Sequence, residues 1–381
     1  MDSTGLTGYQ VRVRCTVKTK HKQSLAAVDL FCGAGGLTKG LQLAGIYVKL
    51  GIDIDPACAF PYEANTKAKF LLKQIENVTT AEINRTFGSA PLRLLAGCAP
   101  CQPFSLYRQG KTNHTDSRWR LLAHFQRLAL AVKPDMVTME NVPKLAETPI
   151  FKRFTSALDR AGFHVWYDIV RCADYGVPQV RQRLVLLASR LGPIALIPPT
   201  HTPERHETVR QAIAALPPLE ANGVDPHDPL HQCCGLSPTN LRRIQASRPG
   251  GTWRDWNKDL VARCHRKSSG KTYPSVYGRM CWDEPSPTLT TQFFGFGNGR
   301  FGHPEQHRAI SLREGAILQS FPKSYLFVKT GEPIYRKRVG QLIGNAVPVK
   351  LGAAIGRSIR KHVHEFLLQE RRKAARKSSA V

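Results

Sequence analysis

Short apolar runs alternate with helical patterns over the first half of the chain. Five runs rich in aliphatic residues are each followed by glycine or polar residues, and they cover residues 24–31, 47–55, 92–97, 134–142 and 183–190. Between these runs, residues 35–45 and 120–132 have apolar side chains at helical spacing, and Gly45 is suited to end the first of these helices. This alternation predicts an α/β fold with a doubly wound, mostly parallel sheet that carries helices on both faces.

The pattern changes after residue 190. Proline and loop residues dominate 192–235, and the stretch 247–280 interleaves basic residues with glycines and aromatics. We therefore expect a larger domain over residues 1–190 and a second, smaller, loop-rich domain over residues 191–324.

The C-terminal residues are expected to return to the larger domain. Residues 341–368 predict a loop that leads into an amphipathic helix, and this helix would bring residues 325–381 back onto the first domain. The last stretch, 370–381, is strongly basic, and we expect it to be frayed and solvated.

The charge balance narrows the class of partner. The chain of 381 residues has 55 Lys and Arg against 28 Asp and Glu, a formal net charge of +27. A surplus of this size favours a polyanionic partner. No apolar run approaches the roughly 20 residues of a membrane span, and the first residues lack the apolar segment of a signal peptide. We therefore expect a cytoplasmic protein that binds nucleic acid and not a membrane, although a ribosome-associated protein or a merely basic surface stays open.

The ten cysteines are scattered, and we interpret them as free thiols. Cys98 and Cys101 form a CxxC pair, but no second pair or Cys/His cluster at ligand spacing supports a zinc site. A redox CxxC normally opens a helix, whereas Pro100 and Pro103 bend the chain on both sides of Cys101. Metal binding and redox activity are therefore disfavoured.

A glycine-rich loop follows the first predicted strand. Gly33, Gly35 and Gly36 let the backbone turn tightly and approach a ligand. A dinucleotide fingerprint starting at Gly33 would need glycine where Thr38 stands, and the Gly-Lys-Ser/Thr of a P-loop is absent from this loop. The loop therefore leaves two interpretations open, a nucleoside ligand without pyrophosphate or a plain tight turn.

Asp53 strengthens the nucleoside interpretation. It ends the second strand about twenty residues after the loop, where a carboxylate can accept hydrogen bonds from both ribose hydroxyls. The adjacent Ile54 can cover an adenine face. These features are typical of an adenosine-type cofactor such as S-adenosylmethionine, while Asp53 and Asp55 as ordinary polar loop residues remain the alternative.

Three further side chains are candidates for chemistry beside Cys101. A free thiol has a pKa of about 8.5 and needs activation, by its environment or by the substrate, to act as a nucleophile. Glu140 follows the apolar residues 136–139 and is expected at the carboxyl edge of the sheet, where partial burial lets it hold a proton. Arg181 and Arg183 precede another strand, share one face, and can bind an anion or a carbonyl oxygen.

The order of these blocks is the specific signal. Residues 29–37, 100–105, 140–142, 179–183 and 344–348 read DLFCGAGGL, PCQPFS, ENV, QVRQR and GNAVP. In this order they resemble the DNA cytosine-5 methyltransferases of bacterial restriction-modification systems. The resemblance extends from about residue 25 to 365 and lacks matching blocks in the middle, over about 191–275. It implies the Rossmann-like fold of class I S-adenosylmethionine-dependent methyltransferases, with the middle stretch inside a target-recognition domain.

The resemblance also implies roles for single residues. Cys101 would add to carbon 6 of a cytosine swung out of duplex DNA, and Glu140 would bond or protonate ring nitrogen 3 while carbon 5 takes the methyl group of S-adenosylmethionine. Arg183 resembles the arginine that holds the base oxygen, and Arg181 would support the catalytic loop and the thiolate. Positions that contact the cofactor in the family match Phe31, Gly33, Gly35, Leu37, Asp53, Ile54, Asn77, Val78, Pro100, Asn345 and Val347.

The DNA-binding residues are less well specified. By the resemblance, Gln102 and Ser105 lie on a segment that closes over flipped DNA, with Gly110 as a hinge. In the middle stretch, Arg248 and Arg254 stand beside glycines and are candidates for reading guanine. Trp253 and Trp256 are expected either in the core of the small domain or in contact with DNA. Lys267 and Lys271 are expected to contact phosphate groups of the DNA.

The chain departs from the family pattern at three positions. Asn77 stands where an aspartate often contacts the adenine amino group, and its amide oxygen can still accept that hydrogen bond. Cys98 and Ala99 replace the Gly, Phe or Pro common before the Pro-Cys pair, and we interpret Cys98 as a small buried filler.

Two alternative functions stay open. One is an RNA (tRNA) cytosine-5 methyltransferase with the same catalytic layout, against which the basic variable region argues. The other is a catalytically silent DNA-binding homologue, against which the retained Cys101, Glu140 and Arg183 argue. The expected partners are double-stranded DNA and a cognate restriction endonuclease acting on the same site, although an orphan methylase fits equally well. We expect a monomer without a metal, associated with the nucleoid through DNA.

Overall fold

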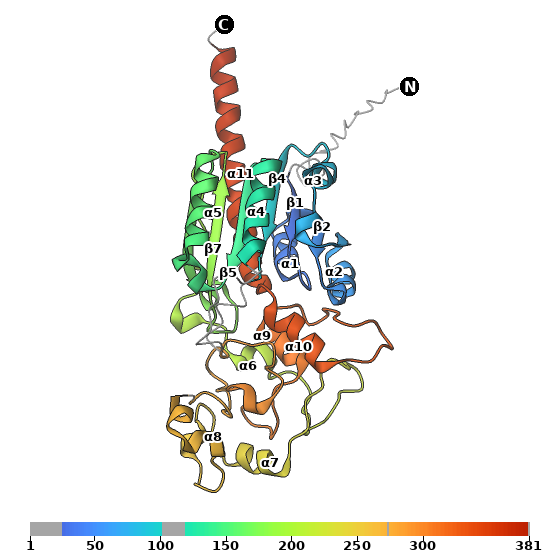
Figure 1. The fold of residues 1–381 in the computed structure, drawn as a ribbon, viewed down its shortest axis with the longest axis vertical. Helices are drawn as coiled ribbons and strands as arrows, with labels where there is room; N and C mark the ends of the chain where they lie inside the picture. The colour runs from blue at the N-terminus through green and yellow to red at the C-terminus, as the bar shows by residue number, and fades with distance from the viewer. Residues whose placement is uncertain (1–24, 101–118, 273, 380–381) are drawn as a thin grey trace, which may run out of the picture.

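The computed structural model describes residues 25–100, 119–272 and 274–379 (Figure 1). Its described part contains a seven-stranded sheet with the strand order β3-β2-β1-β4-β5-β7-β6. The strands are β1 (Leu25–Leu30), β2 (Tyr47–Asp53), β3 (Lys69–Leu72), β4 (Leu92–Gly97), β5 (Met136–Asn141), β6 (His164–Arg171) and β7 (Gln182–Ser189). Neighbours from β3 to β5 run parallel, and β7 runs antiparallel to both β5 and β6. The predicted α/β fold with a mostly parallel sheet is confirmed.

All five apolar runs form strands, namely β1, β2, β4, β5 and β7. Sequence reasoning missed β3, which has only four residues, and β6, which exposes many of its side chains. It also did not predict the direction of β7. The connection between β6 and β7 covers only residues 172–181, which is too short for the crossover that a parallel pair requires.

Helices cover both faces of the sheet (Figure 1). Those of the sheet region are α1 (Gly36–Leu43), α2 (Ala59–Thr66), α3 (Thr80–Phe87), α4 (Trp119–Val132), α5 (Pro149–Arg160) and α11 (Val349–Ser378). All six residues of β1 are buried, and they alternate between two apolar clusters. Ala27 packs in a cluster with Leu41 of α1 and Ile355 of α11, whereas Val28 packs in the opposite cluster with Phe125 of α4. The strand is therefore apolar at every position except Asp29, because both of its faces are covered.

The last helix, α11, packs on the sheet region, and the C-terminal segment differs from the expectation in two details. Residues 341–345 are not a loop, because they form the last turns of α10 (Arg336–Asn345), whose Val339 and Ile343 are buried. The basic tail is not frayed up to Ser378, because α11 continues through residues 370–378, which are rich in good helix formers. The side chains of residues 368–376 are exposed, and Figure 1 shows this end of α11 extending beyond the rest of the protein.

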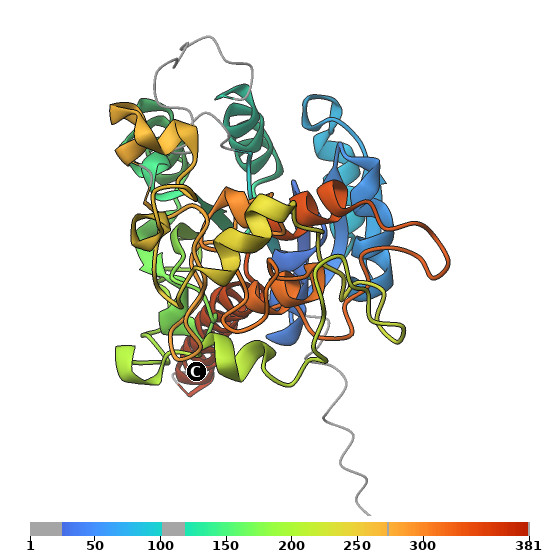
Figure 2. The same cartoon turned by 90° about the horizontal axis from the view of Figure 1, so that it is seen from below.

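The remaining described residues are built mostly from turns and short helices. Their α-helices are α6 (Val209–Ile213), α7 (Pro238–Gln245), α8 (Arg263–Arg266) and α9 (Leu312–Leu318), which precedes α10. Figures 1 and 2 show these elements at one end of the sheet and not over either face. They have their own apolar clusters, a larger one around Phe293 and Leu312 and a smaller one around Trp253 and Trp256.

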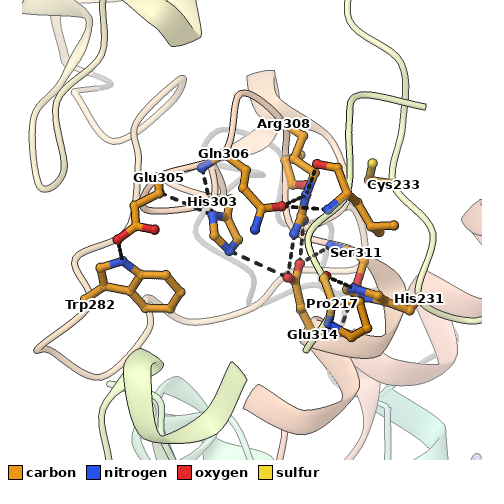
Figure 3. Close-up of polar contacts among 12 residues, drawn as sticks. Pro217, His231, Cys233, Trp282, His303, Glu305, Gln306, Arg308, Ser311 and Glu314 are labelled. Atoms are coloured by element: carbon orange, nitrogen blue, oxygen red, sulfur yellow. Dashed lines mark hydrogen bonds and ion pairs between the residues drawn. The ribbon is translucent and has the colours of Figure 1, made fainter. Parts of the chain in front are cut away.

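A buried polar network fixes the larger of these clusters (Figure 3). Arg308 is fully buried and donates from Nη1 and Nη2 to the two carboxylate oxygens of Glu314, over 2.7 and 2.8 Å. Ser311 caps α9, since its Oγ accepts the backbone N–H of Glu314 and its own N–H bonds the Glu314 carboxylate. His231 lies 2.8 Å from the Ser311 Oγ. The network joins residues 217–233 to residues 303–314, and it satisfies the buried charges.

The described residues show neither a membrane-spanning helix nor a metal-binding cluster. Among the described helices, none is long and apolar enough to cross a membrane. Within the described ranges, no group of three or more His, Cys, Asp and Glu side chains is arranged to hold a metal ion. The eight described cysteines are free thiols, as expected.

Candidate active site

The carboxyl ends of β4 and β5 bring the first site residues together. The two strands are parallel, and Gly97 pairs with Met139. One residue further on, the Cys98 Sγ donates to the Glu140 Oε2 over 2.9 Å. One residue further still, the Asn141 Nδ2 donates to the carbonyl of Ala99 over 2.9 Å. Side chains therefore continue the pairing past the end of β4 and hold the peptide that leads to residue 100.

Glu140 forms an ion pair across the strand on its other side. Because β7 is antiparallel to β5, the amino end of β7 lies at the same edge, and Glu140 is paired with Val185. The Arg183 Nε lies 2.9 Å from the Glu140 Oε1, and the two side chains are only 11% and 3% exposed. The Oε1 atom accepts no hydrogen bond within the described structure. The buried carboxyl therefore has a guanidinium beside Oε1 and a thiol beside Oε2, and Oε1 keeps a lone pair for a further donor.

Arg181 lies close to this pair but has a different set of partners. It is 4% exposed and donates to the carbonyls of Leu289 and Gly344 over 3.0 and 3.2 Å. Burial lowers the pKa of the Arg181 guanidinium to about 9. Gln179, fully buried, donates to the Leu318 carbonyl in the same region. The QVRQR segment therefore ties the carboxyl edge of the sheet to the C-terminal elements.

Several expected residues fall outside the described part of the chain. These are the predicted nucleophile Cys101 and three residues of the following segment, Gln102, Ser105 and Gly110. The described part ends at Pro100, which is exposed. Conversely, sequence reasoning missed two residues that the structure brings to the site. Cys98 is half-buried against Glu140 and is not an inert filler, and Asn141 holds the Ala99 carbonyl. The ENV block was the one signal for Asn141.

The glycine loop after β1 faces open space. Three of its residues have positive φ, namely Phe31, Gly33 and Gly35, at 58°, 52° and 91°. A Cβ on Gly33 would meet no atom within 4 Å, whereas one on Gly35 would meet Thr66 at 2.9 Å. The loop is thus packed on one side and open at Gly33, which is the arrangement that lets a ligand approach the backbone.

Asp53 lies directly beside this loop. Its Oδ2 accepts the N–H of Gly33 over 2.9 Å, and its Oδ1 accepts the N–H of Asp55 over 3.0 Å. Burial raises the pKa of the Asp53 carboxyl. Each oxygen keeps a second lone pair for a hydroxyl donor. Next to it the apolar side chain of Ile54 is 61% exposed. An accepting carboxylate, an apolar surface and an open glycine backbone together fit an adenosine group.

The other expected cofactor positions divide into two groups. The side chains of Leu37, Val78 and Val347 are buried in the apolar clusters, so a ligand could meet only their backbone atoms. Asn77 and Asn345 are exposed. A Cβ at Gly36 would lie 2.2 Å from the Val347 carbonyl oxygen, so residues 346–348 pack directly on the glycine loop.

Asp29 supports the loop from inside the protein and was missed by sequence reasoning. It is fully buried, and the Thr38 hydroxyl donates to its Oδ2 over 2.6 Å. Burial raises the pKa of the Asp29 carboxyl to about 7. Tyr325 donates its hydroxyl to the Ala34 carbonyl in the same loop over 2.5 Å. The only sequence feature that could have indicated Asp29 is its place in the DLF motif, where it precedes the apolar residues Leu30 and Phe31.

The candidate DNA-reading residues lie around a short helix, η9 (Trp253–Asp255). Trp253 and Trp256 are 6% and 7% exposed and belong to the small apolar cluster, so they are core residues. The Arg254 guanidinium lies over the Trp253 ring at 5.6 Å. Arg248 is exposed and pairs with Asp255 over 3.3 Å. Lys267 is exposed, and the side chain of Lys271 is outside the described structure.

Comparisons with known proteins give one consistent result. The family model for C-5 cytosine-specific DNA methylases matches residues 25–361. The chain is 50% identical over 339 residues to the Type II methylase M.HgiDII of Herpetosiphon aurantiacus, which spans 88% of this chain and 95% of that protein. It is 32% identical over 344 residues to the Type II methyltransferase M1.HphI of Haemophilus parahaemolyticus, with 89% and 87% covered. A prophage-encoded protein of E. coli shares the fold, with a TM-score of 0.67 at 21% identity over 90% of this chain and all of that one.

Proposed function

The chain belongs to the C-5 cytosine-specific DNA methylase family and is a DNA cytosine-5 methyltransferase of the Type II restriction-modification kind. On that premise, we propose which residues carry the reaction. The proposal rests chiefly on the pair formed by Glu140 and Arg183, which is buried beside the peptide that enters Cys101. In it, Cys101 is the nucleophile, Glu140 the acid, and Arg183 the group that holds the base.

The chemistry follows from what a cytosine ring requires. When the Cys101 sulfur bonds carbon 6, negative charge develops on ring nitrogen 3. The Glu140 carboxyl gives that nitrogen a proton or a strong hydrogen bond, and the charge no longer accumulates. Arg183 sits against the same carboxyl and is well placed to donate to the base oxygen. Carbon 5 then becomes the nucleophilic atom. After methyl transfer a base takes the proton of carbon 5. The electron pair of that C–H bond re-forms the double bond to carbon 6 and expels the Cys101 sulfur as thiolate, which restores the aromatic ring.

Methyltransferases of this family use S-adenosylmethionine, which supplies a methyl group activated by the sulfonium. We propose that Asp53 accepts from its ribose hydroxyls, that Ile54 covers its adenine, and that the backbone at Gly33 lies against it. The open space at Gly33 and the exposed side chain of Ile54 support this assignment. Phe31, with its positive φ, turns the chain into this loop. Asn77 and Asn345 are the exposed amides that would complete the pocket.

DNA is the substrate, and the remaining residues are assigned to holding it. Residues 191–324 would form the target-recognition domain, and 1–190 with 325–381 the catalytic domain. Arg254 and Arg248 would contact base edges, and Gln102 and Ser105 would close over the flipped cytosine. Support comes from the net charge of +27 and from the exposed Arg248 beside η9. Arg181 would hold the two domains together through the carbonyl of Leu289.

We also propose the biological setting. A cognate endonuclease would cut the same sequence when it is unmethylated, without contacting this enzyme, as the Type II names of the relatives suggest. We expect the enzyme to act as a monomer. Since chromosomal DNA would be the substrate, we expect the enzyme to work at the nucleoid.

Trapping with a modified base tests the proposed nucleophile. A duplex that contains 5-fluorocytosine cannot lose a proton from carbon 5, so the covalent complex should accumulate. We expect labelled methyl transfer to duplex DNA and not to tRNA, together with a denaturation-resistant complex. Cys101→Ala should abolish both while cofactor binding persists. Normal turnover by Cys101→Ala would refute the assignment of the nucleophile, and transfer to tRNA alone would favour an RNA substrate.

A further inference from the structure

We propose that Cys98 is a positioning residue for the catalytic carboxyl of Glu140, an inference that rests on the proposed function of Glu140. The Cys98 Sγ lies 2.9 Å from the Glu140 Oε2. It acts through Glu140 and does not itself bond the substrate.

The position of Cys98 is set by the sheet. Gly97, at the end of β4, pairs with Met139 of β5, and the backbone N–H of Cys98 still bonds the Leu30 carbonyl over 3.2 Å. The backbone of Cys98 is therefore fixed between two strands. Glu140 is fixed in the same way within β5, between β4 and β7. Because both backbones are anchored, the distance from thiol to carboxyl is a property of the fold and does not depend on a mobile loop.

The contact matters because the end of a glutamate side chain is otherwise free to turn. The terminal torsion of Glu has broad, roughly two-fold preferences, so one contact leaves the carboxyl plane poorly defined. Arg183 approaches Oε1 and Cys98 approaches Oε2. Two contacts from opposite neighbouring strands fix the plane. They leave a lone pair of Oε1 without a hydrogen bond in the described structure, available for the ring nitrogen of the base.

A thiol suits this position for a chemical reason. The S–H group is a weak and neutral donor. A lysine or a second arginine at this position would keep the Glu140 carboxyl deprotonated, and it would then be a poorer proton donor to the base. Arg183 and Arg181 already face this carboxyl. The thiol therefore adds orientation without adding positive charge.

Substitution of Cys98 tests the proposal in the full-length enzyme. Cys98→Ala removes the donor, and we expect the single-turnover methylation rate to fall about tenfold. Dissociation constants for duplex DNA and S-adenosylmethionine should stay within about twofold, because neither is held by the thiol. Cys98→Ser keeps a donor of similar size, and it should recover most of the rate. Thermal unfolding of each variant checks that the fold is retained.

Two further measurements separate orientation from general damage. In a Glu140→Ala background there is no carboxyl to orient, so adding Cys98→Ala should change the residual rate by less than about twofold. Cys281 is the matched control, because it is another half-buried free thiol and it lies in the loop-rich region, outside the β4 and β5 ends. Cys281→Ala should keep the wild-type rate.

Each contrary result has a defined meaning. Full activity of Cys98→Ala overturns the positioning role, as do equal losses in Cys98→Ala and Cys98→Ser. A tenfold loss that persists in the Glu140→Ala background overturns it too, since the thiol would then act through another group. Full activity of Glu140→Ala instead overturns the proposed function of Glu140, and with it the role of Cys98. Failure of the further inference and failure of the proposed function are therefore distinguishable.

Discussion

At the residue scale, the site depends on a carboxyl that is buried and still partly unsatisfied. Glu140 is 3% exposed, and burying such a group costs free energy unless it is paired. Arg183 and Cys98 provide that pairing from the strands on either side. The remaining lone pair of Oε1 accepts no hydrogen bond from the described residues. An unsatisfied buried acceptor is unfavourable in the free enzyme, and binding of the base would relieve it.

Glu140→Gln tests the acid at this position. Glutamine keeps the shape of the side chain but cannot give a proton to ring nitrogen 3. We expect the single-turnover methylation rate to fall by about 10² to 10⁴, the range typical of general acid catalysis. Duplex affinity in a gel shift should be unchanged. A wild-type rate would show that the proton comes from elsewhere.

Substitution of Arg254 tests the proposed recognition of the DNA sequence. Its guanidinium lies over the Trp253 ring, so the side chain is held at the edge of the small apolar cluster. Arg254→Ala should reduce discrimination at one base by about 1–3 kcal/mol. Sequencing of 5-methylcytosines in DNA from expressing cells measures this as a broader set of sites. Arg376→Ala, on the exposed end of α11, is the control and should leave the set unchanged. An unchanged set for Arg254→Ala would exclude the residue from recognition.

At the element scale, the glycine loop after β1 is held by the contact between α1 and α11. The two helices approach closely at Gly40 and Gly352, where neither has a side chain. Their apolar residues form one cluster with the sheet, including Leu41 and Ile355. The same arrangement packs residues 346–348 against Gly36 in the loop. A helix from the end of the chain therefore fixes a loop near its beginning.

Gly40→Ala measures how close this contact is. A Cβ at Gly40 would lie 2.5 Å from backbone atoms of Gly352 and Val349, so the helices would have to separate. Helix propensity alone favours alanine by about 1 kcal/mol, but overpacking of this kind typically costs about 3 kcal/mol. We expect net destabilisation of about 2 kcal/mol in urea unfolding, from the difference of these two values.

A matched glycine distinguishes packing from backbone strain. Gly162 has φ of +84°, and a Cβ there would meet no atom within 4 Å. Gly162→Ala should therefore cost only about 1 kcal/mol, from its left-handed backbone alone. A stabilised Gly40→Ala variant would contradict the close packing of α1 on α11.

At the scale of the whole molecule, the sheet region and the loop-rich region are joined by polar side chains as well as by shared apolar contacts such as those of Ala34 and Cys58. Arg181 and Gln179 reach from the edge of the sheet to Leu289, Gly344 and Leu318. Beyond them, the buried Arg308–Glu314 pair holds the loop-rich region together (Figure 3). Such a region has little regular backbone pairing, so its conformation depends on these side-chain networks.

The same network predicts a sensitivity to acid. The His303 Nδ1 accepts the N–H groups of Glu305 and Gln306, so this nitrogen must be unprotonated. Burial lowers the pKa of His303 to about 4, from an ordinary value of 6.5. Between these values the unfolded chain binds a proton that the folded one does not. The stabilisation is therefore complete above pH 6.5 and is lost as the pH falls towards 4, by up to about 3 kcal/mol.

His303→Asn provides the comparison. Its amide oxygen can accept from the same N–H groups but does not titrate, so the variant should be less stable than wild type at pH 7.5. The difference in urea unfolding should shrink as the pH is lowered through 6 and 5. A constant difference across this range would contradict the burial of a neutral His303.

Much of the fold could be predicted from the chain because the strongest signals were local. Runs rich in aliphatic residues, such as those of β1 and β5, predicted strands covered on both faces, and 120–132 predicted α4. Edge elements were missed, since β3 and β6 are short or exposed and their pattern is close to that of a loop. Candidate site residues such as Glu140 and Arg183 were identified because they lie within recognisable motifs. Cys98 was misjudged because its partner is 42 residues away.

The amino-acid sequence by itself determined the alternation of strands and helices, the family, and the chemical types gathered in its motifs, because these depend on side-chain character and spacing along one segment. Tertiary structure alone decided that β7 runs antiparallel, that Cys98 and Arg183 bracket Glu140, and that α11 packs on α1 beside the glycine loop. Strand direction and register join segments far apart in the chain, and they are set by which packing buries the apolar faces of all of them together.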